Sequence, residues 1–97
     1  MVGALQKGLP DLTSRQFTLL LHVYLKDKPH TVRGLAEELN MSKPAVTRAL
    51  DRLGKLEFVR RKTDESDRRS ILVQRTIKGS VFLREFGDMV EDYAEDV

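Results

Sequence analysis

The chain has 97 residues, no cysteine and a formal net charge of +2 at pH 7. This length favours a single domain, residues 1–97, with one modest core, and the lack of cysteine excludes disulfides, zinc–thiolate sites and thiol nucleophiles. No apolar run approaches the length of a membrane span, and residues 1–10 lack the features of a secretory signal. We therefore expect a cytoplasmic protein without a membrane partner.

Charge is distributed unevenly along the chain. Residues 42–75 carry ten basic and five acidic residues, whereas residues 76–97 carry two and six. A basic middle and an acidic end suggest that one face holds a polyanion and another repels it. On charge alone, the alternative that these groups only solvate helix faces stays open.

The first predicted helix begins at a capping box formed by Thr13 and Gln16, which can satisfy free backbone N–H groups at a helix start. The residues from Phe17 to Leu25 are apolar on nearly every side of such a helix, so we expect it at the centre of the fold. The segment 26–29, Lys-Asp-Lys-Pro, ends it.

Two short helices joined by a tight turn follow. Thr31 is expected to cap the first, Asn40 and Met41 to form the turn, and Ser42 to cap the second. In the second helix, 42–56, the apolar residues form one continuous stripe, and the opposite face is charged and polar.

Two segments rich in β-branched and apolar residues, 58–62 and 70–74, are predicted to be strands. The charged stretch between them is predicted to be a hairpin loop, too long for a two-residue turn. Thr76 caps a last helix that runs to about Tyr93 or beyond. The fold class that follows is mainly α with a small β-hairpin (α+β), a winged helix-turn-helix.

Helix 42–56 is the candidate recognition helix. An α-helix fits the major groove of B-DNA, and the N-terminal end of a recognition helix meets the base edges. Near that end the exposed face carries Lys43, Pro44, Thr47 and Arg48. Arg48 could contact guanine through two hydrogen bonds, and Thr47 could read a base pair or a thymine methyl group. Each could also be an ordinary solvated helix residue.

Three segments, TVRGLAEELNMSKPAVTRALDRL, FVRRKTDESDRRSILV and TIKG, resemble the winged-helix core of the MarR family of bacterial transcription regulators, over roughly residues 12–86. The most specific feature is the wing motif Asp67-x-Arg69, followed by an alternating strand and Thr76. The resemblance implies a dimeric regulator, often a repressor, that binds double-stranded DNA. Its recognition helix would enter the major groove and its wing, residues 60–75, the minor groove. By the same resemblance Arg69 enters the minor groove, and Asp67 holds the Arg69 guanidinium in place beforehand.

The expected DNA-binding set combines the two short helices with the wing. Asp64 and Glu65 are expected at the tip of the wing, where solvent screens their charge. The set is Thr31, Arg33, Ser42, Lys43, Pro44, Thr47, Arg48, Arg52, Arg61, Asp67, Arg68 and Arg69.

Three departures from the family pattern stand out. Arg75 occupies a position that is usually leucine, and Glu57 replaces the glycine that commonly ends the recognition helix, so we expect an irregular helix end there. Family members usually have long helices on both sides of this core, whereas this chain has about eleven residues before Leu12. The sequence therefore assigns no small-molecule effector.

The two ends of the chain, residues 1–11 and 87–97, are predicted to form a homodimer. Apolar residues of the last helix lie within an arc of about 140°, and we expect its distal part to extend beyond what one small domain can cover. The N-terminal apolar residues are spaced to pack on that stripe in a partner. The alternative is that the tail folds back or frays. The expected interface is Val2, Leu5, Leu9, Phe86, Met89, Val90 and Tyr93.

Other chemistry finds little support in the sequence. His22 and His30 lack partners at metal-ligand spacing, and the serines and glycines lack the context of a nucleophile elbow or a phosphate-binding loop. We therefore expect neither an enzyme nor a cofactor or metal. Besides DNA binding, the alternative function is a winged-helix adaptor that binds proteins without reading bases.

Overall fold

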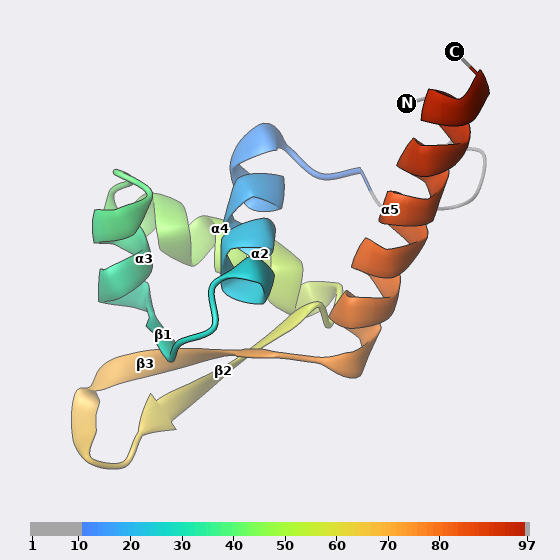
Figure 1. Cartoon of the computed structure of the whole chain (residues 1–97). Coiled ribbons are helices and arrows are strands. Elements are labelled where there is room, and N and C mark those ends of the chain that lie inside the picture. The colour runs from blue at the N-terminus through green and yellow to red at the C-terminus, as the bar shows by residue number, and fades with distance from the viewer. Residues whose placement is uncertain (1–10, 97) are drawn as a thin grey trace.

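The computed structural model describes residues 11–96. The helices α2, α3 and α4 form one body, the ribbon of β2 and β3 projects from it, and α5 rises on the other side (Figure 1). No helix in this range is long and apolar enough to cross a membrane. The elements are α2 (Ser14–Leu25), β1 (His30–Thr31), α3 (Val32–Glu38), α4 (Lys43–Lys55), β2 (Val59–Asp64), β3 (Asp67–Arg75) and α5 (Ile77–Asp96).

The four helices within residues 11–96 begin at the caps that the sequence predicts. The side-chain oxygens of Thr13, Thr31, Ser42 and Thr76 each accept a hydrogen bond from the backbone N–H three residues later, at distances between 2.9 and 3.2 Å. At Thr13 the capping box is complete, because Gln16 accepts from the Thr13 N–H in return. Local polar chemistry thus sets where each helix starts.

The ends of α3 and α4 share one geometry. Asn40 follows α3 with a φ of 53°, and Glu57 follows α4 with a φ of 63°. After α4, the N–H of Phe58 donates to the carbonyl of Leu53 and that of Glu57 to the carbonyl of Gly54, both at 2.9 Å. These two backbone hydrogen bonds, together with a residue in the left-handed conformation, form the Schellman motif. The irregular helix end predicted at Glu57 is therefore wrong: the cap is regular, and Glu57 itself adopts the left-handed conformation that glycine usually takes there.

The sheet contains three antiparallel strands in the order β1-β3-β2. The sequence predicted two of them. The missed strand, β1, pairs His30 with Val73 and Thr31 with Leu72, and two residues are too few to show an alternating pattern. Because β1 runs directly into α3, it fixes the edge of β3 against the helical body.

The prediction of a long hairpin loop is wrong. The ladder of β2 and β3 continues from Val59 opposite Arg75 to Asp64 opposite Asp67, with one irregularity near the tip. Only Glu65 and Ser66 remain in the turn. Strands that solvent reaches on both faces need no apolar residues, so charged side chains did not reveal them.

Asp64 shapes this short turn. Its carboxylate accepts hydrogen bonds from the Ser66 N–H at 3.0 Å and from the Ser66 hydroxyl at 2.7 Å. These bonds lower the pKa of the Asp64 carboxyl below its ordinary value. Asp64 therefore closes the turn rather than only carrying charge at the tip.

The core lies where α2, α3, α4, the bases of β2 and β3, and the start of α5 meet. The predicted central position of α2 is confirmed for its middle residues, while Leu25 at its end is exposed. The buried set is Leu19, Leu20, Val23, Leu35, Ala36, Val46, Ala49, Leu50, Leu53, Phe58, Val59, Val73 and Phe82.

Tyr24 joins three elements at one point. Its hydroxyl lies 2.7 Å from the carbonyl of Phe58, just before β2, and accepts a 2.9 Å hydrogen bond from the N–H of Thr76, just before α5. Gly79 lies so close to this point that a Cβ there would overlap both the Tyr24 hydroxyl and the Phe58 carbonyl. Glycine is therefore required where α5 crosses α2.

Arg75 closes the C-terminal end of α2. Its Nε donates to the carbonyl of Val23 at 2.9 Å and its Nη2 to that of Lys26 at 3.0 Å. These are carbonyls that a helix end leaves without intrahelical partners. The arginine that departs from the family pattern thus connects the last residue of β3 to α2.

The apolar face of α5 continues the core along α2. Phe82 stacks on Phe58 with ring centroids 4.4 Å apart, and Phe86 lies 4.8 Å from Phe17. Met89 follows Phe86 by three residues and so lies on the same face of α5. It is only 4% exposed, so the expectation that it lies uncovered beyond the domain is wrong.

Unlike Met89, two other distal residues of α5 are exposed as the sequence predicts. Val90 and Tyr93 are 49% and 52% exposed. The other residues predicted for the interface, Val2, Leu5 and Leu9, lie outside the described residues.

Candidate nucleic-acid interface

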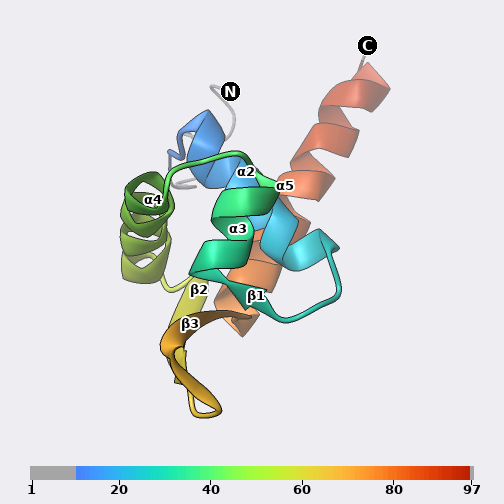
Figure 2. The same ribbon diagram turned by 90° about the vertical axis from the view of Figure 1, so that its left-hand side faces the viewer.

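The outer face of α4 presents the predicted recognition residues together. Lys43, Pro44, Thr47, Arg48 and Arg52 are all exposed, because the opposite stripe of the helix is buried in the core. Figure 2 shows α4 at one side of the molecule and the β2–β3 ribbon projecting beside it, both away from the distal end of α5. Helix and wing therefore form adjoining parts of one surface.

Three further residues of the predicted set lie outside the exposed face of α4 and the wing ribbon: Thr31 in β1, Arg33 on α3 and Ser42 at the start of α4. The hydroxyls of Ser42 and Thr31 already accept capping hydrogen bonds, and Thr31 is half-buried in β1. Arg33 is exposed on α3. Their expected DNA contacts stay predictions.

The wing motif is more closely tied to the backbone than the resemblance implied. One Asp67 oxygen accepts from the Arg69 N–H at 3.1 Å and the other from the Ser70 hydroxyl at 3.2 Å. The Arg69 guanidinium is 93% exposed, and its Nε lies 3.7 Å from the Asp67 carboxylate, which is beyond hydrogen-bonding distance. Asp67 therefore shapes the strand and attracts the guanidinium without fixing it.

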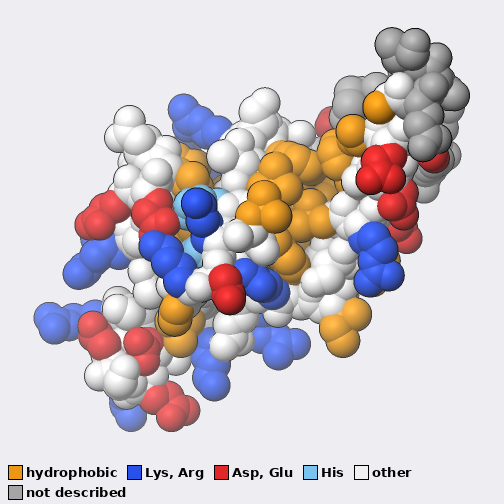
Figure 3. All heavy atoms as spheres, in the orientation of Figure 1, with side chains coloured by type: hydrophobic (Ala, Val, Ile, Leu, Met, Phe, Trp, Pro, Cys, Tyr) orange, Lys and Arg blue, Asp and Glu red, His pale blue; other side chains and the backbone are white. Residues whose placement is uncertain are grey.

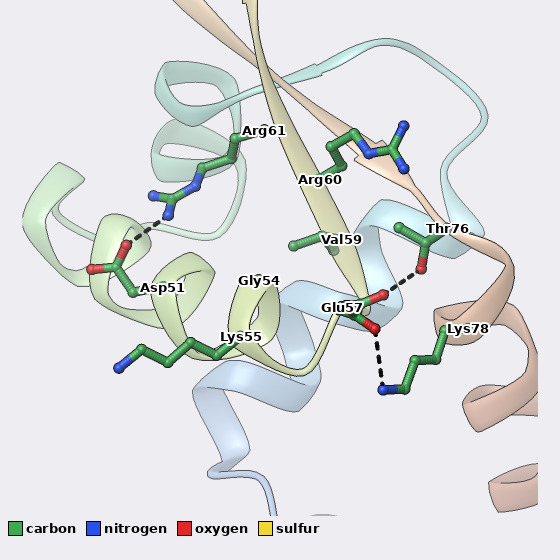
Figure 4. A pocket seen from close by; sticks show the side chains of 9 residues that line it. All are labelled: Asp51, Gly54, Lys55, Glu57, Val59, Arg60, Arg61, Thr76 and Lys78. Atoms are coloured by element: carbon green, nitrogen blue, oxygen red, sulfur yellow. Dashed lines mark hydrogen bonds and ion pairs between the residues drawn. The ribbon is translucent and has the colours of Figure 1, made fainter.

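Arg61 makes a contact that the sequence did not predict. Its Nη2 donates to Oδ1 of Asp51 on α4 at 2.8 Å, so the side chain points from β2 toward α4 (Figure 4). The signal available in the sequence was the position of Asp51 on the exposed face of helix 42–56. The pairing itself depends on where β2 lies in the fold.

A hollow of about 830 Å³ separates the C-terminal half of α4 from the base of β2 and the start of α5 (Figure 4). Lys55 and Arg60 line it and were absent from the predicted set. Both belong to the basic middle third, but neither lies near the N-terminus of the recognition helix or the wing tip. The other charged lining residues are Asp51, Glu57, Arg61 and Lys78.

Charge separates across the molecule as the sequence suggests. Figure 3 shows basic and acidic side chains mixed on the wing, and acidic side chains along the upper part of α5. Glu85, Asp88, Glu91 and Asp92 of α5 are all exposed. The distal part of α5 is therefore acidic, whereas the wing carries charges of both signs.

The two histidines take part in local contacts. His22 lies 2.7 Å from a Glu38 oxygen, and Lys28 pairs with the other oxygen. His30 is buried, with its Nε2 2.9 Å from the Lys26 carbonyl. Within residues 11–96 no three His, Cys, Asp or Glu residues are grouped to hold a metal ion.

The sequence model of the MarR family matches residues 12–71, more than half of the chain. The chain belongs to the MarR family. The resemblance seen in the three sequence segments is thereby confirmed. The matched range of this MarR-family chain contains every predicted DNA-binding residue, from Thr31 to Arg69, and ends before α5. No curated protein matches the chain.

Solved structures of MarR-family proteins have the same winged-helix fold. A transcriptional regulator from Thermotoga maritima is 26% identical with a TM-score of 0.79, over 97% of this chain and 64% of that one. A mutant MarR from E. coli, complexed with operator DNA, is 31% identical with a TM-score of 0.69, over 77% and 53%. A MarR transcriptional regulator from Methanosarcina mazei is 30% identical with a TM-score of 0.73, over 87% and 60%. The chain thus spans between 53% and 64% of these regulators.

Proposed function

We propose that this MarR-family chain is a transcriptional regulator that binds double-stranded DNA in a sequence-specific manner and acts as a repressor. The observation that carries the proposal is the shared surface of α4 and the wing, where the exposed Thr47 and Arg48 lie on the helix and the exposed Arg68 and Arg69 on the ribbon. Support also comes from the 31% identical E. coli MarR mutant, which was solved with operator DNA.

The two parts of the surface have different tasks in this proposal. The N-terminal half of α4 enters the major groove, where Arg48 contacts a guanine and Thr47 reads the adjoining position. The wing reaches the neighbouring minor groove with Arg69, whose side chain is almost wholly free to enter it. A protein held in both grooves blocks that stretch of DNA to other proteins, which is the basis for repression.

A titration of the protein with fluorescent random duplex at two salt concentrations tests DNA binding itself. Contacts to phosphate release counterions, so the affinity should fall steeply as salt increases. If the chain binds no duplex at low salt, the proposal is contradicted. The alternative function, an adaptor that binds proteins without reading bases, is then favoured.

Two substitutions test the division between helix and wing. Arg48→Ala should relax the preference at one base pair, at a cost of about 1 to 3 kcal/mol, whereas Arg69→Ala should weaken binding most on sites with A·T-rich flanks, where the minor groove is narrow. Arg84→Ala, which removes an exposed arginine from α5, is the matched control. Equal losses on every sequence would instead show that Arg48 and Arg69 only touch phosphate.

We also infer that two copies bind DNA together. The half-exposed Val90 and Tyr93 on the distal turns of α5 provide apolar surface for a partner, and α5 extends past the helical body (Figure 1). A two-fold dimer would place its recognition helices roughly 34 Å apart, one turn of DNA, and would require a nearly palindromic site.

A further inference from the structure

The Asp51–Arg61 ion pair lies where the wing leaves the helical body. In the ladder, Arg61 is opposite Val73, and Val73 is the last residue of β3 toward the tip that is buried in the core. Farther out, Leu72 is half-buried and Ile71 exposed. The pair therefore acts at the level where the core stops supporting the ribbon.

The two edges of the ribbon are held differently. The β3 edge pairs with β1, which places Thr31 opposite Leu72. The β2 edge has no neighbouring strand within residues 11–96. There, the hydrogen-bonded ion pair of Asp51 and Arg61 connects β2 to α4. Both side chains are partly exposed, at 54% and 35%, so the pair adds little to global stability. Its effect should appear in the geometry of the wing.

We propose that Asp51 and Arg61 are positioning residues that set the angle between the recognition helix and the wing. This inference rests on the proposed DNA-binding function. Two contact surfaces engage one DNA molecule more tightly when their separation is fixed beforehand, because less conformational freedom is lost on binding. Arg61 thereby acts through the wing arginine Arg69 instead of through its own contact with DNA.

Asp51 distinguishes this role from a direct phosphate contact by Arg61. Asp51 is an exposed acid on the face of α4 that carries Thr47 and Arg48. If it positions nothing, its replacement by a neutral residue removes repulsion from phosphate, and binding tightens. If it positions the wing, the same replacement weakens binding although the protein becomes more basic. The two roles predict changes of opposite sign.

The first measurement is fluorescence anisotropy of Asp51→Asn with a duplex that the wild-type protein has selected from a random pool. We expect affinity to fall by roughly threefold, in the range of a lost surface ion pair, with the salt dependence unchanged. The control is Glu57→Gln, which neutralises another acid of the same hollow that pairs with Lys78, and it should not weaken binding. Unchanged or tighter binding by Asp51→Asn overturns the inference.

A double-mutant cycle identifies the path of the effect. In an Arg69→Ala background the wing has lost its minor-groove contact, so Asp51→Asn should cause no further loss. Losses that add in full would show that Asp51 does not act through the wing, which overturns the inference as well.

The last measurement needs no DNA. The ¹⁵N relaxation order parameters of amides in residues 62–70 should fall in Asp51→Asn and stay unchanged in Glu57→Gln, because only the first frees the β2 edge on the picosecond-to-nanosecond scale. A wing equally ordered in both variants contradicts the inference. Because the measurement is made on the free protein, a wild type that binds no duplex defeats the proposed function without deciding the role of Asp51.

Discussion

Glu57 holds a backbone conformation that favours glycine. Its φ of 63° places the Cβ near the following carbonyl, which costs a residue other than glycine about 1 to 2 kcal/mol. Asn40 ends α3 in the same conformation, but asparagine tolerates it better than glutamate does. The end of α4 is thus strained at a single residue, directly before the wing begins.

Replacing Glu57 by glycine should therefore stabilise the protein. We expect the free energy of unfolding to increase by about 1 kcal/mol, measured by urea denaturation. Glu57→Ala is the control, because it removes the same side chain but keeps the strained backbone, and it should leave stability nearly unchanged. Equal gains in both variants would assign the effect to the side chain.

Gly79 should tolerate no side chain. Gly79→Ala would force a methyl group against the Tyr24 hydroxyl and the Phe58 carbonyl, and we expect a loss of roughly 3 kcal/mol in thermal denaturation. Gly87→Ala is the matched control on the same helix, since nothing lies within 4 Å of a Cβ there, and it should be neutral or stabilising. Adding Tyr24→Phe should recover only part of the loss, because the Phe58 carbonyl stays in place.

The elements of this fold differ in how well the sequence predicts them. Each helix start depends on one polar side chain and a backbone group three residues away, so the caps at Thr13, Thr31, Ser42 and Thr76 could be read directly. The exposed polar face of α4 followed from helical periodicity alone. The length of the wing could not be predicted, because its outer residues are exposed on both faces and held by backbone pairing between β2 and β3, which leaves no apolar pattern in the sequence. The pairing of Asp51 with Arg61 could not be predicted either, because it depends on where β2 lies against α4 in the fold.

The connection between α2 and α3 should respond to acid. Hydrogen bonds from Lys28 and then His22 lower the pKa of Glu38 from 4.5 to about 2. A carboxyl with a lowered pKa in the folded state contributes stability above about pH 4.5, and that contribution is lost as the pH falls toward 2. We expect urea midpoints to decrease over this window, and to decrease less in Glu38→Gln.

The matched control for this pH dependence is Glu37→Gln. It removes an acid from the neighbouring position of α3 but keeps Glu38 as the partner of Lys28 and His22. Its urea midpoint should therefore decrease with falling pH as in the wild type. If wild type and Glu38→Gln lose stability in parallel between pH 4.5 and 2, the ion pairs of Glu38 do not connect α2 to α3.

At the scale of the whole molecule, the apolar residues at the distal end of α5 should control assembly. Val90→Glu and Tyr93→Glu place a charge on surface that is already half-exposed in one chain, so they should leave the fold intact and convert a dimer to a monomer. Light scattering after size exclusion measures the mass. Ser80→Glu, which adds the same charge on an exposed position near the start of α5, should stay dimeric. A wild-type chain that is monomeric at micromolar concentration would contradict the dimer.

The outer part of the β2–β3 ribbon lies outside the core, so its sequence can change during evolution with little effect on stability. Side chains from Thr63 to Arg69 are mostly exposed and none belongs to the buried core, so mutations there escape the stability threshold that restricts core positions. The turn-forming Asp64 and the strand-shaping Asp67 are the exceptions, because they hold the ribbon's own backbone. Between these two fixed points, selection can exchange the residues at the tip. If the wing binds DNA as proposed, target preference can change in this way while the rest of the fold is retained.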